Sequence, residues 1–149
     1  MPTIARPFIA VLVITAATTT TKGTVEIVLP PYLAGYGYAL SLIGFLTSLI
    51  AVLQLISRLP VGVAYRAHRV KRQLALALVA FAVSTSGFAF AGGQPLAVAV
   101  LSVLHGFAFG SLGTLGLALA IDVSGGRRAG VAMAWYTAAN STVWVFTQT

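Results

Sequence analysis

The sequence of 149 residues contains no cysteine and only two acidic residues, Glu26 and Asp122. Without cysteine, the chain has no disulfide framework, no thiolate metal site and no cysteine nucleophile. Two acids and two histidines also fall short of the cluster of titratable groups at one depth that a membrane enzyme needs. We therefore expect no enzyme, no metal site and no cofactor.

Charged residues of either sign are scarce, at 7% of the chain, whereas hydrophobic residues make up 58%. Soluble domains carry about a quarter charged residues. The apolar runs reach the length of about 20 residues that a membrane helix needs, so the sequence predicts an all-α protein in a lipid bilayer. The net charge of +7 would suggest a nucleic-acid partner in a soluble protein. Here the basic residues lie at the ends of apolar runs, so we expect no nucleic-acid partner.

Proline, glycine and charge divide the chain into about five predicted spans within one transmembrane domain. They cover residues 7–29, 38–57, 73–90, 95–121 and 129–149. Pro30 and Pro31 end the first span, and the sequence AGGQP at 91–95 separates the third from the fourth. Paired glycines allow a turn, and proline can begin a helix but not continue one.

The start of the chain has an alternative interpretation as a cleaved signal peptide. The apolar run 8–17 is short and follows a basic residue, Arg6. The sequence contains no A-x-A cleavage pattern there, and four more apolar runs follow. These observations favour an uncleaved first span.

The segment 58–72, RLPVGVAYRAHRVKR, holds five of the nine basic residues and no acid. Basic segments between spans stay in the cytoplasm. With 58–72 and 122–128 as cytoplasmic loops, Arg6, Arg127 and Arg128 fall on the same side. The opposite turns, 32–37 and 91–95, contain no lysine or arginine. We therefore predict a multi-pass protein of the cytoplasmic membrane with its amino terminus in the cytoplasm.

Polar residues inside the predicted spans are the candidate binding residues. Lys22 and Glu26 are four residues apart, and their helix face also carries Thr15, Thr18 and Thr19. An ionisable group at the bilayer centre costs about 2.5 to 3.5 kcal/mol. This stripe is therefore predicted to face a substrate or proton site in a cavity, and the alternative is a structural ion pair.

The fourth and fifth spans add further polar residues. His105 could relay protons or hydrogen-bond across helices, and we favour the hydrogen bond. Asn140 needs a partner in hydrocarbon, either a substrate or a facing helix. Tyr136 lies one helical turn before it. The fourth span also carries small residues predicted to let a neighbouring helix approach closely: Ser102, Gly106, Gly110, Gly113 and Gly116.

Two stretches carry a family resemblance. Arg58, Leu59, Pro60 and Gly62 match the approach to a characteristic loop between second and third spans, and Lys71 and Arg72 match its basic end. Arg66 stands in place of that motif's aspartate, Ala67 in place of its arginine and Arg69 in place of its glycine. The stretch 104–141 is similar to a fourth span, the loop after it and the start of a fifth span. Together they resemble the amino-terminal, six-helix half of a major facilitator superfamily transporter.

The resemblance implies a carrier that moves a small organic solute, such as a drug or metabolite for efflux, by alternating access. Its candidate substrate-binding residues are Lys22, Glu26, His105, Tyr136 and Asn140. Its gating loop comprises Arg58, Gly62, Arg66, Arg69, Lys71 and Arg72 with Asp122, and we expect Asp122 to pair with Arg66, Arg69 or a nearby basic residue.

The resemblance also bears on the extent of the chain. Family members have twelve spans in two halves, so we expect a partial chain, cut within its fifth span. Its partner would be the missing carboxy-terminal half or another membrane subunit. The alternative function is that of a non-transporting helical membrane protein that packs against a partner subunit.

Overall fold

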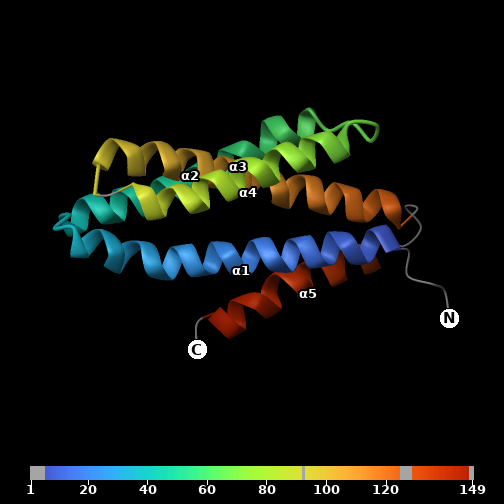
Figure 1. The fold of residues 1–149 in the computed structure, drawn as a ribbon. Coiled ribbons are helices and arrows are strands. Elements are labelled where there is room, and N and C mark those ends of the chain that lie inside the picture. The colour runs from blue at the N-terminus through green and yellow to red at the C-terminus, as the bar shows by residue number, and fades with distance from the viewer. Residues whose placement is uncertain (1–5, 92, 125–128, 148–149) are drawn as a thin grey trace.

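The computed structural model describes residues 6–91, 93–124 and 129–147, and the side chains within 8–91, 93–124 and 129–141. These residues form five helices and no strand. The helices are α1 (Arg6–Gly35), α2 (Leu40–Val63), α3 (Val70–Phe90), α4 (Pro95–Val123) and α5 (Ala129–Thr147) (Figure 1). The all-α fold predicted from the sequence is confirmed.

Four helices are long and apolar enough to cross a bilayer: Phe8–Gly35 of α1, and the whole of α2, α3 and α4. Large apolar side chains cover their outer surfaces, among them Leu40, Phe45, Leu76 and Phe90. Such a surface needs an apolar solvent. The chain is therefore a multi-pass membrane protein in contact with lipid, and α5, with 19 residues, remains the predicted fifth span.

Helix α4 lies at the centre of the bundle and contacts each of the other four helices. Its glycines allow a close approach of α2. A Cβ atom on Gly106 would collide with the carbonyl oxygen of Ile50, and one on Gly110 would collide with the carbonyl oxygen of Gln54. The close packing expected from the small residues is confirmed at these two positions. A Cβ atom on Gly113, by contrast, would meet no atom within 4 Å.

The buried apolar residues form two clusters. One lies near the end of the bundle that holds the α1–α2 and α3–α4 turns, with Leu33, Leu46 and Val98 at its centre. The other lies between α3 and α4 and includes Phe81, Leu112 and Leu115. The main contacts of α5 are with α1 and α4, and it lies at one edge of the bundle (Figure 1).

Two helices extend beyond their predicted ends, which came from Pro30 and Pro31 for the first span and from the start of the basic loop for the second. Helix α1 continues through Pro30 and Pro31 to Gly35, and α2 continues through Pro60 to Val63. Proline has a helical φ angle, and neighbouring groups in a membrane protein can satisfy the carbonyl oxygens that it frees. The predicted loop 58–72 is therefore helical at both ends, with a connection of only residues 64–69. The opposite turns contain Gly37 and Gly93 at positive φ angles of 79° and 76°.

Candidate functional site

A cavity of about 500 Å³ lies among the five helices, and we call it the central cavity. It lies toward one end of the bundle, where α1 begins, α2 and α4 end and α5 begins. We call this the basic end, because it holds the basic residues of the segment 58–72. Two cations line it, Lys22 and Arg58, together with the aromatic ring of Phe109. Its uncharged polar lining consists of Thr15, Thr18, Thr19, Gln54, Thr114, Tyr136, Thr137 and Asn140.

Helix α1 supplies one polar face to the central cavity. Thr15, Thr18, Thr19 and Lys22 follow each other at helical spacing, and all four are buried. The hydroxyls of Thr15 and Thr18 donate to the carbonyl oxygens of Val11 and Ile14, at 2.9 Å and 2.8 Å. The polar stripe seen in the sequence thus faces protein, with its hydroxyls satisfied partly by the helix backbone.

Lys22 takes part in both arrangements that the sequence left open. Its ammonium lies 2.6 Å from the carboxylate of Glu26, and its side chain is 6% exposed against 35% for Glu26. The ammonium also lies 5.3 Å from the centre of the Phe109 ring, within cation–π range. Lys22 lines the central cavity, whereas Glu26 lies outside the lining and forms the ion pair with Lys22.

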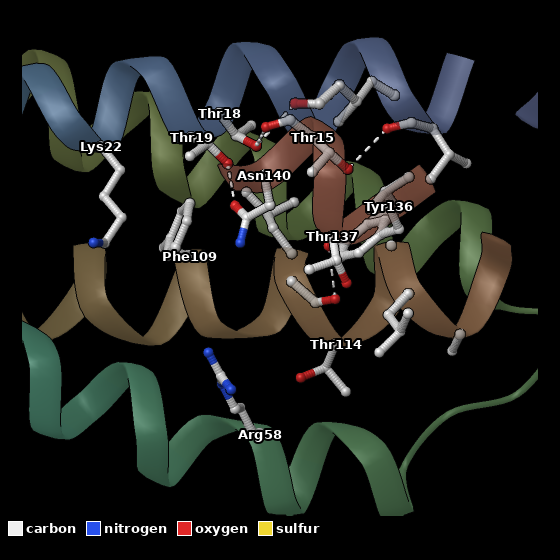
Figure 2. A pocket seen from close by; sticks show the side chains of 18 of the residues that line it. Thr15, Thr18, Thr19, Lys22, Arg58, Phe109, Thr114, Tyr136, Thr137 and Asn140 are labelled. Carbon is white, nitrogen blue, oxygen red and sulfur yellow. Dashed lines mark hydrogen bonds between the residues drawn. The ribbon is translucent and has the colours of Figure 1, made fainter. Parts of the chain in front are cut away.

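Helix α5 is joined to its neighbours by two predicted site residues. Thr19 donates a hydrogen bond of 2.8 Å to the side-chain oxygen of Asn140. The hydroxyl of Tyr136 donates to the carbonyl oxygen of Gly113 at 2.9 Å. Because the oxygen of Asn140 faces Thr19, its amide nitrogen points the other way, toward the side where the guanidinium of Arg58 lies (Figure 2).

His105, like Glu26, is a predicted binding residue outside the lining of the central cavity, but it lies in a different place. It is fully buried, and it lies outside the lining of the central cavity. Its Nδ1 lies 3.2 Å from the hydroxyl of Ser84 on α3, and its ring lies 4.7 Å from that of Phe81. This is the interhelical hydrogen bond favoured from the sequence. Its Nε2 has no hydrogen-bond partner in the described part of the chain.

The predicted gating residues lie at the basic end. Arg58 on α2 lines the central cavity, and a Cβ atom on Gly62 would lie 3.8 Å from the side chain of Thr114. Arg58 is exposed, as are the other four basic residues of the predicted gating loop: Arg66, Arg69, Lys71 and Arg72. Among the described residues, none of these four forms an ion pair with Asp122.

The carboxylate of Asp122 instead accepts a hydrogen bond from the hydroxyl of Tyr65. Partial burial, and then this hydrogen bond and the negative charge of Asp122, raise the pKa of Tyr65 to about 12. The side-chain amide of Gln73 donates to the carbonyl oxygen of Ala64 at 2.9 Å, which fixes the connection between α2 and α3. Tyr65 therefore ties this connection to the end of α4.

Several lining residues were missed from the sequence. Gln54 lies four residues before Arg58, so its isolated polarity at helical spacing from a cation was a usable signal. Thr114 and Thr137 gave none, because a threonine in a membrane helix can bond to its own backbone, as Thr114 does to Gly110. Phe109 resembles any other apolar residue until the fold brings it beside Lys22.

No curated protein and no solved structure matches this chain. The family model described as Major Facilitator Superfamily matches residues 8–147. That range runs from the first turn of α1 to the last residue of α5, and it confirms the resemblance seen in the sequence. The chain therefore belongs to the Major Facilitator Superfamily.

Proposed function

We propose that this chain carries a small organic solute across the cytoplasmic membrane by alternating access, with the central cavity as the solute site. Members of its family are transporters, not enzymes. The observation that carries the proposal is a polar cavity of about 500 Å³ within a bundle of apolar helices. Small-molecule sites usually occupy roughly 300 to 1,000 Å³.

Polar side chains inside a membrane protein cost free energy, and their presence in the lining supports a role of the central cavity in solute binding. Cations and amides inside a membrane protein are unfavourable unless they pair or face water or a ligand. Lys22, Tyr136 and Asn140 are the predicted binding residues that line the central cavity. In the proposed site they contact the solute, Glu26 orients Lys22, and His105 stabilises the packing of α3 on α4.

The positive charge of the basic end supports a particular orientation of the chain in the membrane. Positive segments remain in the cytoplasm, so we place the amino terminus and the connection 64–69 there. The central cavity then lies on the cytoplasmic side, from which an exported drug or metabolite would enter. Of the predicted gating residues, Arg58 lines the cavity and the others lie at the same end of the bundle. The hydrogen bond between Tyr65 and Asp122 is one contact that opening and closing of this end would change.

The direct test is uptake of a panel of labelled anionic, neutral and cationic solutes into vesicles that contain the purified chain. We expect saturable uptake of at least one solute, and its loss in Lys22→Ala. Leu76→Ala, on the outer surface of α3, is the control and should transport as the wild type does.

Because Lys22→Ala could also disturb folding, Asn140→Ala is measured in parallel, and helix content is checked for each variant. Uptake of no solute by the wild-type chain would contradict the proposal. Wild-type rates in both cavity variants would contradict the assignment of the site.

A further inference from the structure

The charged side chains that line the central cavity are all positive. Its lining includes two cations, Lys22 and Arg58, and neither of the two acids of the sequence. Glu26 lies next to the lining and pairs with Lys22, while Asp122 bonds to Tyr65 outside it. When the Lys22–Glu26 pair is counted as neutral, Arg58 still leaves the cavity with a net positive charge.

The hydrogen-bond donors of the lining are also unevenly distributed. Most of its hydroxyl protons already bond to protein: Thr15, Thr18, Thr114 and Tyr136 donate to backbone carbonyl oxygens, and Thr19 donates to Asn140. The donors that remain for a ligand are mainly nitrogen groups. These are the guanidinium of Arg58 and the amide nitrogens of Asn140 and Gln54.

The cations lie at different depths. Arg58 is five residues before the end of α2, and Lys22 is sixteen residues after the start of α1. At 1.5 Å per residue they lie about 8 Å and about 24 Å from the basic end. Between them the wall also contains apolar side chains, among them Phe109 and Leu112. The cavity thus has a positive entrance at Arg58 and an apolar side, and the charge of Lys22 at its deep end is paired with Glu26.

From this arrangement we infer that the solute is a small organic anion, a carboxylate attached to an apolar body. Arg58 and the amide nitrogen of Asn140 bind the carboxylate, and the apolar body packs against Phe109. Arginine donates two parallel, charge-assisted hydrogen bonds to a carboxylate. The inference rests on the proposed transport function and adds the charge class of its substrate.

Binding of matched compounds tests the charge class. The probes are benzoate, its neutral isostere benzamide and the cation benzylammonium, together with the corresponding phenylpropyl compounds. Titration calorimetry measures their binding to the chain in lipid nanodiscs. We expect each carboxylate to bind at least about tenfold more tightly than its amide, because a hydrogen bond to a charged acceptor is stronger than one to a neutral acceptor. The ammonium compounds should bind most weakly.

Variants separate the role of charge from that of shape. Arg58→Gln should abolish the preference for carboxylates, and Arg58→Lys should keep most of it. Asn140→Asp keeps an oxygen facing Thr19 but adds a negative charge, so it should weaken carboxylates and leave the amides unchanged. Leu59→Ala, beside Arg58 but outside the lining, should behave as the wild type.

The results distinguish this inference from the proposed function. Equal or tighter binding of the amides or ammonium compounds would overturn the charge class, as would a preference for carboxylates that survives both Arg58→Gln and Asn140→Asp. In either case, uptake of another solute class in the vesicle assay would leave the transport function standing. Absence of both binding and uptake for all three classes would contradict the transport function as well.

Discussion

At the scale of single residues, the Lys22–Glu26 pair shows how unequal burial divides the roles of two charges. The Lys22 side chain is nearly buried, whereas about a third of the Glu26 side chain is exposed. Loss of Lys22 leaves a carboxylate that water or lipid headgroups can reach. Loss of Glu26 leaves a buried ammonium without that counter-ion, which is the more costly state.

We therefore predict that Glu26→Gln lowers the free energy of unfolding by about 2 kcal/mol, and by more than Lys22→Met does. The double variant should be more stable than Glu26→Gln alone, because it removes both charges. Chemical unfolding in detergent micelles measures all three. A larger loss for Lys22→Met than for Glu26→Gln would contradict the proposed roles.

Tyr65 should give the stability of the basic end a dependence on pH. Its pKa is raised in the folded chain from 10.0 to about 12. The contribution of its hydrogen bond to Asp122 is thus fully present below pH 10, and it is lost as the pH rises toward 12.

We predict that Tyr65→Phe lowers the free energy of unfolding by about 1 kcal/mol at neutral pH. The difference between wild type and variant should shrink between about pH 10 and about pH 12. The two proteins differ only at residue 65, so this difference isolates Tyr65. A difference that stays constant across that range would refute the assignment.

The sequence predicted some of these residues and not others, for a physical reason. Residues 15, 18, 19 and 22 share one helix face because of local geometry, so their stripe could be found without a structure. His105 needed a partner inside the membrane, but only the packing of α4 decides that this partner is Ser84 rather than a solute. The bond between Tyr65 and Asp122 joins residues 57 positions apart, and no local pattern encodes it.

At the scale of helices, the contact between α2 and α4 depends on the absence of side chains. A methyl group on Gly106 or Gly110 would collide with the backbone of α2, whereas one on Gly113 would meet open space. Backbone atoms cannot move aside as the end of a flexible side chain can. The two helices would have to separate to accept either methyl group.

We expect Gly106→Ala and Gly110→Ala each to lower the free energy of unfolding by about 1 to 3 kcal/mol through overpacking. Gly113→Ala is the matched control on the same helix. It should be neutral or slightly stabilising, since alanine favours helix over glycine by up to about 1 kcal/mol. An equal loss for all three variants would show that the effect does not come from the contact with α2.

The extents of the helices were predicted less well than their existence. Uninterrupted apolar runs identified all four of the longest helices, because burial in lipid requires a regular backbone. The predicted end of the first span depended on Pro30 and Pro31 and that of the second on the start of the basic loop, and neither feature ends the observed helix. In α1 and α2 the tertiary structure tolerates proline inside the helix, and a single sequence does not reveal this.

At the scale of the whole molecule, the account joins three features: an apolar exterior, a central cavity with polar walls, and one basic end. The exterior requires the bilayer, and the basic end sets the proposed orientation. Water must then reach the central cavity from the cytoplasm if a solute is to enter there. This access is the central claim, and the absence of native cysteine makes it measurable by single-cysteine labelling.

The measurement is the labelling of Thr114→Cys by a small, charged, membrane-impermeant thiol reagent in inside-out and right-side-out vesicles. Thr114 lines the central cavity on α4. Ala67→Cys marks the exposed connection between α2 and α3, and Leu76→Cys marks the outer surface of α3, where 61% of the leucine is exposed. We predict that the cysteines at 114 and 67 react from the cytoplasmic face and that the cysteine at 76 does not. A cysteine at 114 as unreactive as that at 76 would contradict the account.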